Sequence, residues 1–271
     1  MTPKTHHCFL QTFPYNIYHM NIKLFEEYTG SKIGKVRLLP FRMHDISNEI
    51  ELYNIANSIY AVKVNDVRIR CYLFLRYQEY YEGSSKNIRG NRFSIDQFIK
   101  WYSEEYKNKE MFTYAYDWCG FNIPSWSIEE CLSKIIDENE YDRLMSNIFS
   151  SCISDNDGKN FYLLGVDSLD SDILDHEMAH GMYYTDSDYK TTMDEITESI
   201  PVDSYAALKK IILDMGYGDN VIDDEIQAYM STGLRESMSE IPNLDEFLPS
   251  YRETFDHFLS KNKRGLKKMD F

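Results

Sequence analysis

Residues 161–184 read FYLLGVDSLDSDILDHEMAHGMYY, and this stretch decides how the second half of the chain is expected to fold. The apolar run Phe161–Val166 predicts a short strand. A polar turn follows, and the next residues predict a helix from about Ser171 to Tyr184. This helix carries the pentapeptide HEMAH at residues 176–180, whose residue types are those of a metal site.

The pentapeptide places His176 and His180 four residues apart, so both imidazoles point to the same side of a helix. Two neutral imidazoles on one face can take two corners of a zinc tetrahedron. Glu177 lies too far around the helix to complete that tetrahedron easily, but it can accept a proton from a water at the open position. We therefore expect a zinc ion on both histidines, with Glu177 as general base. The alternative is an ordinary amphipathic helix with two hydrogen-bonded histidines.

Glu225 is the first candidate for a third ligand. It follows Ile222 by three residues and precedes Tyr229 by four, so it lies on the apolar stripe of a helix predicted from about Val221 to Ser237. A carboxylate on a buried face is costly unless it is paired or bound to a metal. The alternative role is compensation of the helix dipole, because three acidic residues occupy the first turn.

Asp186 is the competing candidate, because it follows His176 by ten residues. Metzincins place their third ligand at this interval, after a glycine that lets the chain turn sharply. Here Tyr183 stands at the position of that glycine, and a tyrosine at positive φ is unfavourable. The sequence therefore favours Glu225 over Asp186.

HEMAH, followed by Glu225 in the stretch DDEIQAY, resembles the zinc site of gluzincin-type metallopeptidases. The spacing is more similar to that of the anthrax lethal factor catalytic domain than to the shorter spacing of thermolysin. The resemblance covers about Phe161 to Ser237, under a third of the chain. It implies a zincin-like fold in which Phe161–Val166 is the edge strand that aligns an extended peptide above the zinc.

The resemblance also implies a role for each matching residue. His176 and His180 match the histidine ligands, Glu177 the general base, and Glu225 the glutamate ligand on the second helix. Such enzymes need a hydrogen-bond donor to the oxyanion, often Tyr or His. The candidates are Tyr217, in a glycine turn before Glu225, and then Tyr184 and Tyr229; we favour Tyr217.

The fold class expected for the whole chain is α+β and zincin-like, with a small mixed sheet, an active-site helix and a mostly helical carboxyl-terminal half. We expect residues 1–150 to form an α+β region of unknown role, with substrate recognition as its candidate role, and 151–271 to form the catalytic region. The other predicted strands are Lys35–Met43, Ser58–Val64 and Asp66–Tyr77. The other predicted helices begin at Ser94 or cover about Ser127–Asp137, Tyr141–Cys152, Val202–Met215 and Leu244–Leu259.

Three further segments are predicted to lie outside regular elements. Glu79–Arg92 reads as a polar loop, and a polar link is expected between the HEMAH helix and Val202. The basic stretch Lys261–Lys268 is expected to be a solvated tail. The aromatic segment at 111–126 could line a substrate groove, although core packing is the more frequent role of such a segment.

Composition narrows the range of partners and compartments. The net charge of −15 and the pI of about 4.9 make nucleic acid a poor partner. Five scattered cysteines, without a CxxC pair, suit a reducing compartment. The sequence offers neither a signal peptide nor an apolar run long enough for a membrane, so we expect a soluble, cytoplasmic protein, with signal-less export remaining open.

These observations predict a zinc metallopeptidase, a hydrolase whose partner is a peptide or protein substrate. HExxH with a carboxylate can also hold iron in an oxygenase-type site, or serve the hydrolysis of another amide. A third class is a non-catalytic interaction protein that uses a zincin fold as a scaffold. The presence of Glu177 disfavours the non-catalytic interpretation, because a scaffold does not need a general base.

Overall fold

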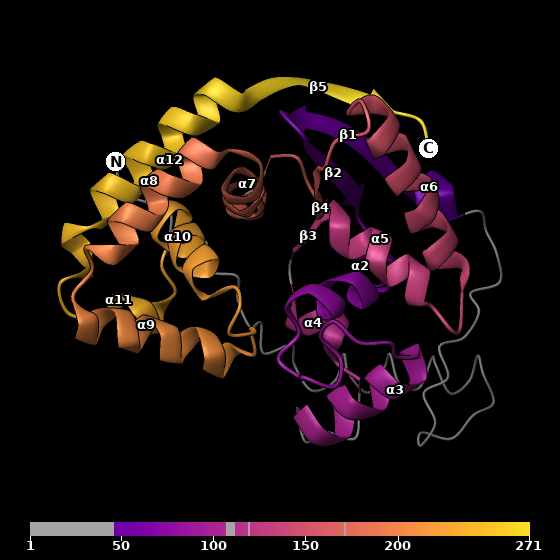
Figure 1. Ribbon diagram of the computed structural model, residues 1–271, viewed down its shortest axis with the longest axis horizontal. Helices are drawn as coiled ribbons and strands as arrows, with labels where there is room; N and C mark the ends of the chain where they lie inside the picture. Colours follow the sequence, from indigo (N-terminus) through magenta and orange to yellow (C-terminus); the bar gives the residue numbers. More distant parts are fainter. Residues whose placement is uncertain (1–45, 107–111, 119, 171) are drawn as a thin grey trace.

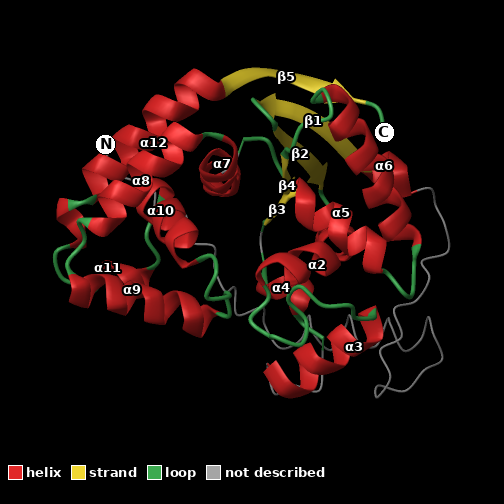
Figure 2. Cartoon of the chain, viewed as in Figure 1, coloured by secondary structure: helices red, strands yellow, loops and turns green. Residues whose placement is uncertain are grey.

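A five-stranded mixed sheet forms the centre of the computed structural model, which describes residues 46–106, 112–118, 120–170 and 172–271 (Figures 1 and 2). The strand order is β3-β4-β2-β1-β5. The strands are β1 (Ile50–Ala56), β2 (Ile59–Val64), β3 (Phe121–Pro124), β4 (Tyr162–Val166) and β5 (Lys263–Met269). β2 and β4 are parallel, whereas the other neighbouring pairs are antiparallel. The strand predicted at 35–43 lies outside the described residues.

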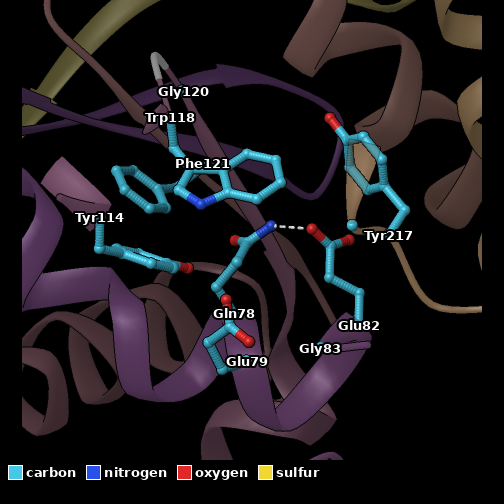
Figure 3. A pocket seen from close by; sticks show the side chains of 10 residues that line it. Gln78, Glu79, Glu82, Gly83, Tyr114, Trp118, Gly120, Phe121 and Tyr217 are labelled. Carbon is cyan, nitrogen blue, oxygen red and sulfur yellow. Dashed lines mark hydrogen bonds between the residues drawn. The ribbon is translucent and has the colours of Figure 1, made fainter. Parts of the chain in front are cut away.

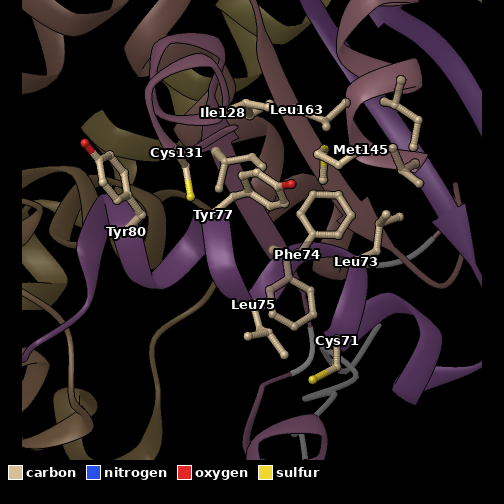
Figure 4. Packing of buried hydrophobic residues seen from close by; sticks show 14 of the residues in the cluster. Cys71, Leu73, Phe74, Leu75, Tyr77, Tyr80, Ile128, Cys131, Met145 and Leu163 are labelled. Carbon is tan, nitrogen blue, oxygen red and sulfur yellow. The ribbon is translucent and has the colours of Figure 1, made fainter. Parts of the chain in front are cut away.

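Helices cover both faces of the sheet, so alternate side chains of each strand enter two different cores. One core contains Val62 and Leu163 and packs against α2 (Val67–Glu82), α5 (Ser125–Lys134) and α6 (Glu140–Asp155), as Figure 4 shows in part. The other core contains Ala61 and Leu164 and packs against α7 (Asp172–Thr185), the HEMAH helix. The mixed sheet and its helical layers confirm the α+β class.

Helix α2 occupies the stretch for which the sequence predicts a strand, so the strand prediction at 66–77 is wrong. Asp66 begins the helix, because its side chain accepts a hydrogen bond from the backbone amide of Arg68. The branched and aromatic residues that suggested a strand are buried around most of the helix. Even Arg76 is only 2 % exposed on its side chain and pairs with Asp142. A helix buried on most sides lacks the amphipathic spacing by which a sequence reveals it.

The carboxyl-terminal half is mostly helical, as predicted. After α7 come α8 (Ser187–Glu198), α9 (Val202–Met215), α10 (Ile222–Thr232), α11 (Glu236–Ser239) and α12 (Leu248–Asn262). α8 occupies the segment predicted to be a polar link, so that prediction is wrong. The helix predicted to reach residue 237 ends at Thr232, because Gly233 adopts a φ of 150°.

Shorter helical segments complete the described chain. They are η1 (Ile46–Glu49), α3 (Ile95–Lys100), the π-helical turn η2 (Trp101–Tyr106), α4 (Tyr114–Asp117) and η3 (Leu244–Glu246). Ser94 caps α3, as the sequence predicts. The loop predicted from Glu79 is shorter than expected, since α2 continues to Glu82. No helix among the described residues is long and apolar enough to cross a membrane.

Two predictions about the ends of the sheet are wrong. The segment at 161–166 was predicted to be an edge strand, but β4 is an inner strand between β3 and β2. The edge strand next to β4 is β3. The basic stretch at 261–268 is not a solvated tail, because β5 pairs with β1. The ammonium group of Lys267 lies 2.6 Å from a carboxylate oxygen of Asp155, and that of Lys268 lies 2.5 Å from a carboxylate oxygen of Glu51. The sheet takes strands from both sides of residue 150, and the division into two regions there stays a prediction.

Candidate metal centre

Helices α7 and α10 pack against each other and bring three of the predicted ligands together. His176 and His180 lie one turn apart on α7, with ring centroids separated by 5.0 Å. Glu225 lies in the first turn of α10 and is 1 % exposed. One nitrogen or oxygen atom of each residue lies within 4.8 Å of the others. The three side chains could therefore hold one metal ion.

Each histidine is oriented by a contact to its Nδ1 atom. Nδ1 of His180 lies 2.8 Å from Oδ1 of Asp224, and Nδ1 of His176 lies 3.2 Å from the hydroxyl of Thr232. That hydroxyl donates its own proton to the carbonyl of Ala228, so it accepts from His176. A proton on Nδ1 leaves the Nε2 lone pair free in both rings. Metal-binding histidines are commonly held in this way.

The orienting carboxylate of Asp224 is itself held in place. The amide of Gln227 donates to it at 3.0 Å, and the hydroxyl of Tyr189 donates to the amide oxygen of Gln227 at 2.8 Å. Gln227 and Tyr189 are fully buried. This series of hydrogen bonds connects α7, α8 and α10, so the position of the His180 ring depends on the packing of all three helices.

Two polar atoms at the centre of the cluster have no hydrogen-bond partner among the described residues. They are Nε2 of His180 and Oε2 of Glu225, both buried. Nε2 of His180 lies 3.6 Å from the other oxygen of Glu225, which is too long for a hydrogen bond. Buried polar groups are nearly always satisfied, so these atoms call for a partner. A divalent ion between them would satisfy both, and the His₂Glu donor set fits zinc.

The charges of the cluster also bear on metal binding. Partial burial, followed by repulsion from His180, holds the pKa of His176 well below its usual value, so this ring is neutral near pH 7. Burial alone would lower the pKa of His180, but attraction by Asp224 and Glu225 outweighs it and raises this pKa well above the usual value. Burial raises the pKa of Glu225 to about 8. His180 and Glu225 therefore hold at least one proton at neutral pH without a metal.

Zinc affinity is expected to fall as the pH is lowered from 8 to 6. A ligand must lose its proton to bind zinc, and the pKa values of His180 and Glu225 are raised, so protons compete with zinc below about pH 8. The expected slope is about tenfold in affinity per pH unit for each proton displaced. Competition titration against a chelator, corrected for the chelator's own protonation, measures it. An affinity that does not change over this range contradicts the assignment of these ligands.

Glu177 is 5 % exposed, and its carboxylate has a defined orientation. The side-chain amide of Asn122, on edge strand β3, donates to Oε2 of Glu177 at 2.8 Å. The hydroxyl of Tyr162 donates to the amide oxygen of Asn122 at 2.5 Å, which fixes the direction of that amide. A methyl group on Gly120 would lie 2.1 Å from Oε1 of Glu177, so only glycine leaves room for this carboxylate. Burial raises the pKa of Glu177, which suits a group that takes up a proton.

Of the three tyrosines proposed as donors to the oxyanion, Tyr217 and Tyr229 contact each other, whereas Tyr184 packs elsewhere. The hydroxyl of Tyr217 is 3.4 Å from that of Tyr229, to which Nε of Arg235 donates at 3.1 Å. The Tyr229 ring lies 4.7 Å from the His176 ring, between centroids. Burial and then repulsion by Glu225 raise the pKa of Tyr217 well above its usual value, so its phenol keeps a proton to donate. Tyr184 instead packs on Tyr162, with centroids 5.1 Å apart.

Asp186 does not join the metal cluster of the described residues. It caps α8, since its side chain accepts hydrogen bonds from the backbone amides of Asp188 and Tyr189. The side-chain amide of Asn262 donates to its other oxygen at 3.0 Å. Tyr183 remains helical, because α7 continues to Thr185. The tight turn that would return Asp186 to the histidines is therefore not formed.

Four residues of this site were not found from the sequence: Gly120, Asn122, Asp224 and Thr232. Gly120 directly precedes β3 and Asn122 lies in it, both more than 50 residues before His176, and no local pattern marks them. Asp224 was visible only as one of three acidic residues in a helix start. No known family model matches the chain, and no curated protein or solved structure shows significant similarity to it.

Proposed function

We propose that this protein is a zinc-dependent metallopeptidase. The observation that carries the proposal is the pair of unsatisfied buried atoms, His180 Nε2 and Glu225 Oε2, at the meeting point of a histidine pair and a glutamate. His176, His180 and Glu225 would hold the ion. Zinc bound there would supply Lewis acidity toward a carbonyl oxygen and an attacking water.

The chain's own residues then have distinct tasks. Glu177 accepts a proton from the attacking water and passes it to the leaving nitrogen. Asn122 keeps the carboxylate of Glu177 in one orientation through its hydrogen bond. Tyr217, whose phenol is protonated, donates to the oxygen that gains negative charge as the carbonyl is attacked. Water is restricted by the burial of Glu177 and Glu225, which strengthens each of these electrostatic contacts.

Edge strand β3 supports a peptide as the substrate. One side of β3 pairs with β4, and β3 ends the strand order of the described sheet. The backbone amide of Asn122 already donates to Gln78, so an extended peptide at this edge would pair with the other backbone groups of β3. Since Asn122 of β3 contacts Glu177, a peptide bound along β3 would pass beside the proposed base.

Metal analysis and cleavage of a peptide library test the proposal together. Elemental analysis is expected to find about one zinc per chain, and the zinc-loaded protein is expected to cut peptides that the chelator-treated protein leaves intact. His176→Ala should lose most of the zinc and the cleavage. His257→Ala is the matched control, because His257 is exposed on α12. A full zinc complement in His176→Ala, or an intact library with zinc-loaded protein, contradicts the proposal.

A further inference from the structure

A small pocket lies beside the proposed base and has no role in the mechanism above (Figure 3). Glu79 and Glu82 of α2 form one wall, and the rings of Tyr114, Trp118 and Phe121 form another. Tyr217 and Gly120 also line it, and Gly120 is the residue against which the Glu177 carboxylate lies. A group held in the pocket would therefore be a near neighbour of the scissile bond.

Glu82 is 7 % exposed, so its carboxyl group is largely removed from water. The side-chain amide of Gln78 donates to its Oε1 atom, and the backbone amide of Asn122 donates to the amide oxygen of Gln78 at 3.0 Å. These two contacts fix which end of the Gln78 amide faces Glu82. Burial raises the free energy of a negative charge on Glu82, and repulsion by Glu225 adds to this cost. A buried carboxylate in this position calls for a cation.

The pocket itself supplies no such cation, because its lining includes neither lysine nor arginine. A zinc ion at the histidine cluster would be bound by Glu225, so it would not supply the cation for Glu82. Glu79 adds a second carboxylate, which accepts a hydrogen bond from the Tyr114 hydroxyl. Two carboxylates in one pocket attract a positive group from the ligand more strongly than one does.

The aromatic wall offers ring surfaces to a positive group and also one donor, because the buried indole Nε1 of Trp118 has no hydrogen-bond partner among the described residues. Trp118 and Tyr217 meet edge to face with centroids 5.4 Å apart, and Tyr114 lies 6.1 Å from Trp118. Faces of Trp and Tyr attract ammonium groups through the ring quadrupole, and such rings with carboxylates are a recurring way to bind amines. The free volume of about 10 Å³ admits one group of the size of water. It thus suits a primary ammonium and excludes guanidinium or trimethylammonium.

We propose that this pocket binds the primary ammonium group of a peptide substrate, supplied by a free amino terminus or by a lysine side chain next to the scissile bond. The inference rests on the proposed peptidase function, and it adds the substrate class. Glu82 forms the ion pair, Glu79 adds negative potential, and the aromatic rings exclude water from the pair.

Binding of three hydroxamates to the zinc-loaded protein, measured by calorimetry, tests the inference without any need for turnover. Norleucine hydroxamate carries an α-ammonium, Nα-acetyl-lysine hydroxamate carries only the ε-ammonium, and Nα-acetyl-norleucine hydroxamate carries neither. At least one of the two amines is expected to bind about tenfold or more tightly than the neutral compound. The tighter of the two identifies the source of the ammonium group.

Glu82→Gln is expected to abolish this preference and leave binding of the neutral hydroxamate unchanged. The amide can still accept from Gln78, and removal of a buried charge does not endanger folding. Glu79→Gln should reduce the preference partly, while Glu129→Gln, an exposed position on α5, should keep it. Equal binding of all three compounds, or a preference that survives Glu82→Gln, overturns this inference but leaves the proposed metal site standing. Failure of the protein to bind any hydroxamate overturns the metal site and the inference with it.

Discussion

Zinc-loaded Glu177→Gln protein is expected to cleave peptides about 10²- to 10⁴-fold more slowly than the wild type. Glutamine has nearly the same shape as glutamate, and its oxygen can still accept the hydrogen bond from Asn122. It cannot take a proton from water, however, so the variant lacks the base and little else. Since Glu177 is not one of the three proposed ligands, zinc should remain bound at the wild-type level.

Three measurements on the same preparation test this expectation. Turnover of a library peptide gives the cleavage rate, elemental analysis gives the zinc content, and thermal denaturation shows whether the fold is intact. Glu195→Gln, an exposed position on α8, is the matched control and should behave like the wild type. Turnover close to that of the wild type in Glu177→Gln would remove the base from the mechanism. Loss of zinc from this variant would instead place Glu177 among the ligands.

The parts of this site that were predictable from the sequence are those that depend on local spacing. Two histidines four residues apart on a helix share a face, and α7 places them so. The placement of Glu225 on an apolar stripe indicated burial, and the structure leaves it 1 % exposed. Helix α9 has the predicted bounds because its amphipathic pattern is complete over Val202–Met215.

The parts that were missed depend on contacts between distant segments. The order of strands is set by how the whole chain packs, so the sequence could not show that β3 rather than β4 forms the edge. Asn122 reaches Glu177 across 55 residues, and Thr232 reaches His176 across 56. The long buried helix α2 was mistaken for a strand because burial on most sides removes helical periodicity. Each of these features contributes residues at or beside the proposed site.

Glu225→Ala and Asp186→Ala are expected to separate zinc binding from helix capping. Glu225 has an unsatisfied oxygen at the histidine cluster, so its removal should weaken zinc binding by more than the roughly 10- to 100-fold typical of a lost outer contact. Asp186 accepts two backbone hydrogen bonds at the start of α8, so its removal should cost about 0.5–2 kcal/mol of unfolding free energy and leave zinc affinity unchanged.

The stability of the metal-free proteins makes this contrast sharper. Without zinc, the buried Glu225 carboxylate is desolvated, and its attraction to His180 is opposed by repulsion from Asp224 and Glu177, so Glu225→Gln should unfold close to the wild-type temperature. Zinc stabilises the state that binds it, so saturating zinc should raise the melting temperature of the wild type and of Asp186→Ala but not of Glu225→Gln. Chelator competition and thermal denaturation with and without zinc give both quantities. Loss of zinc binding in Asp186→Ala alone would make Asp186 the third ligand and replace the proposed gluzincin-type site by a metzincin-type one.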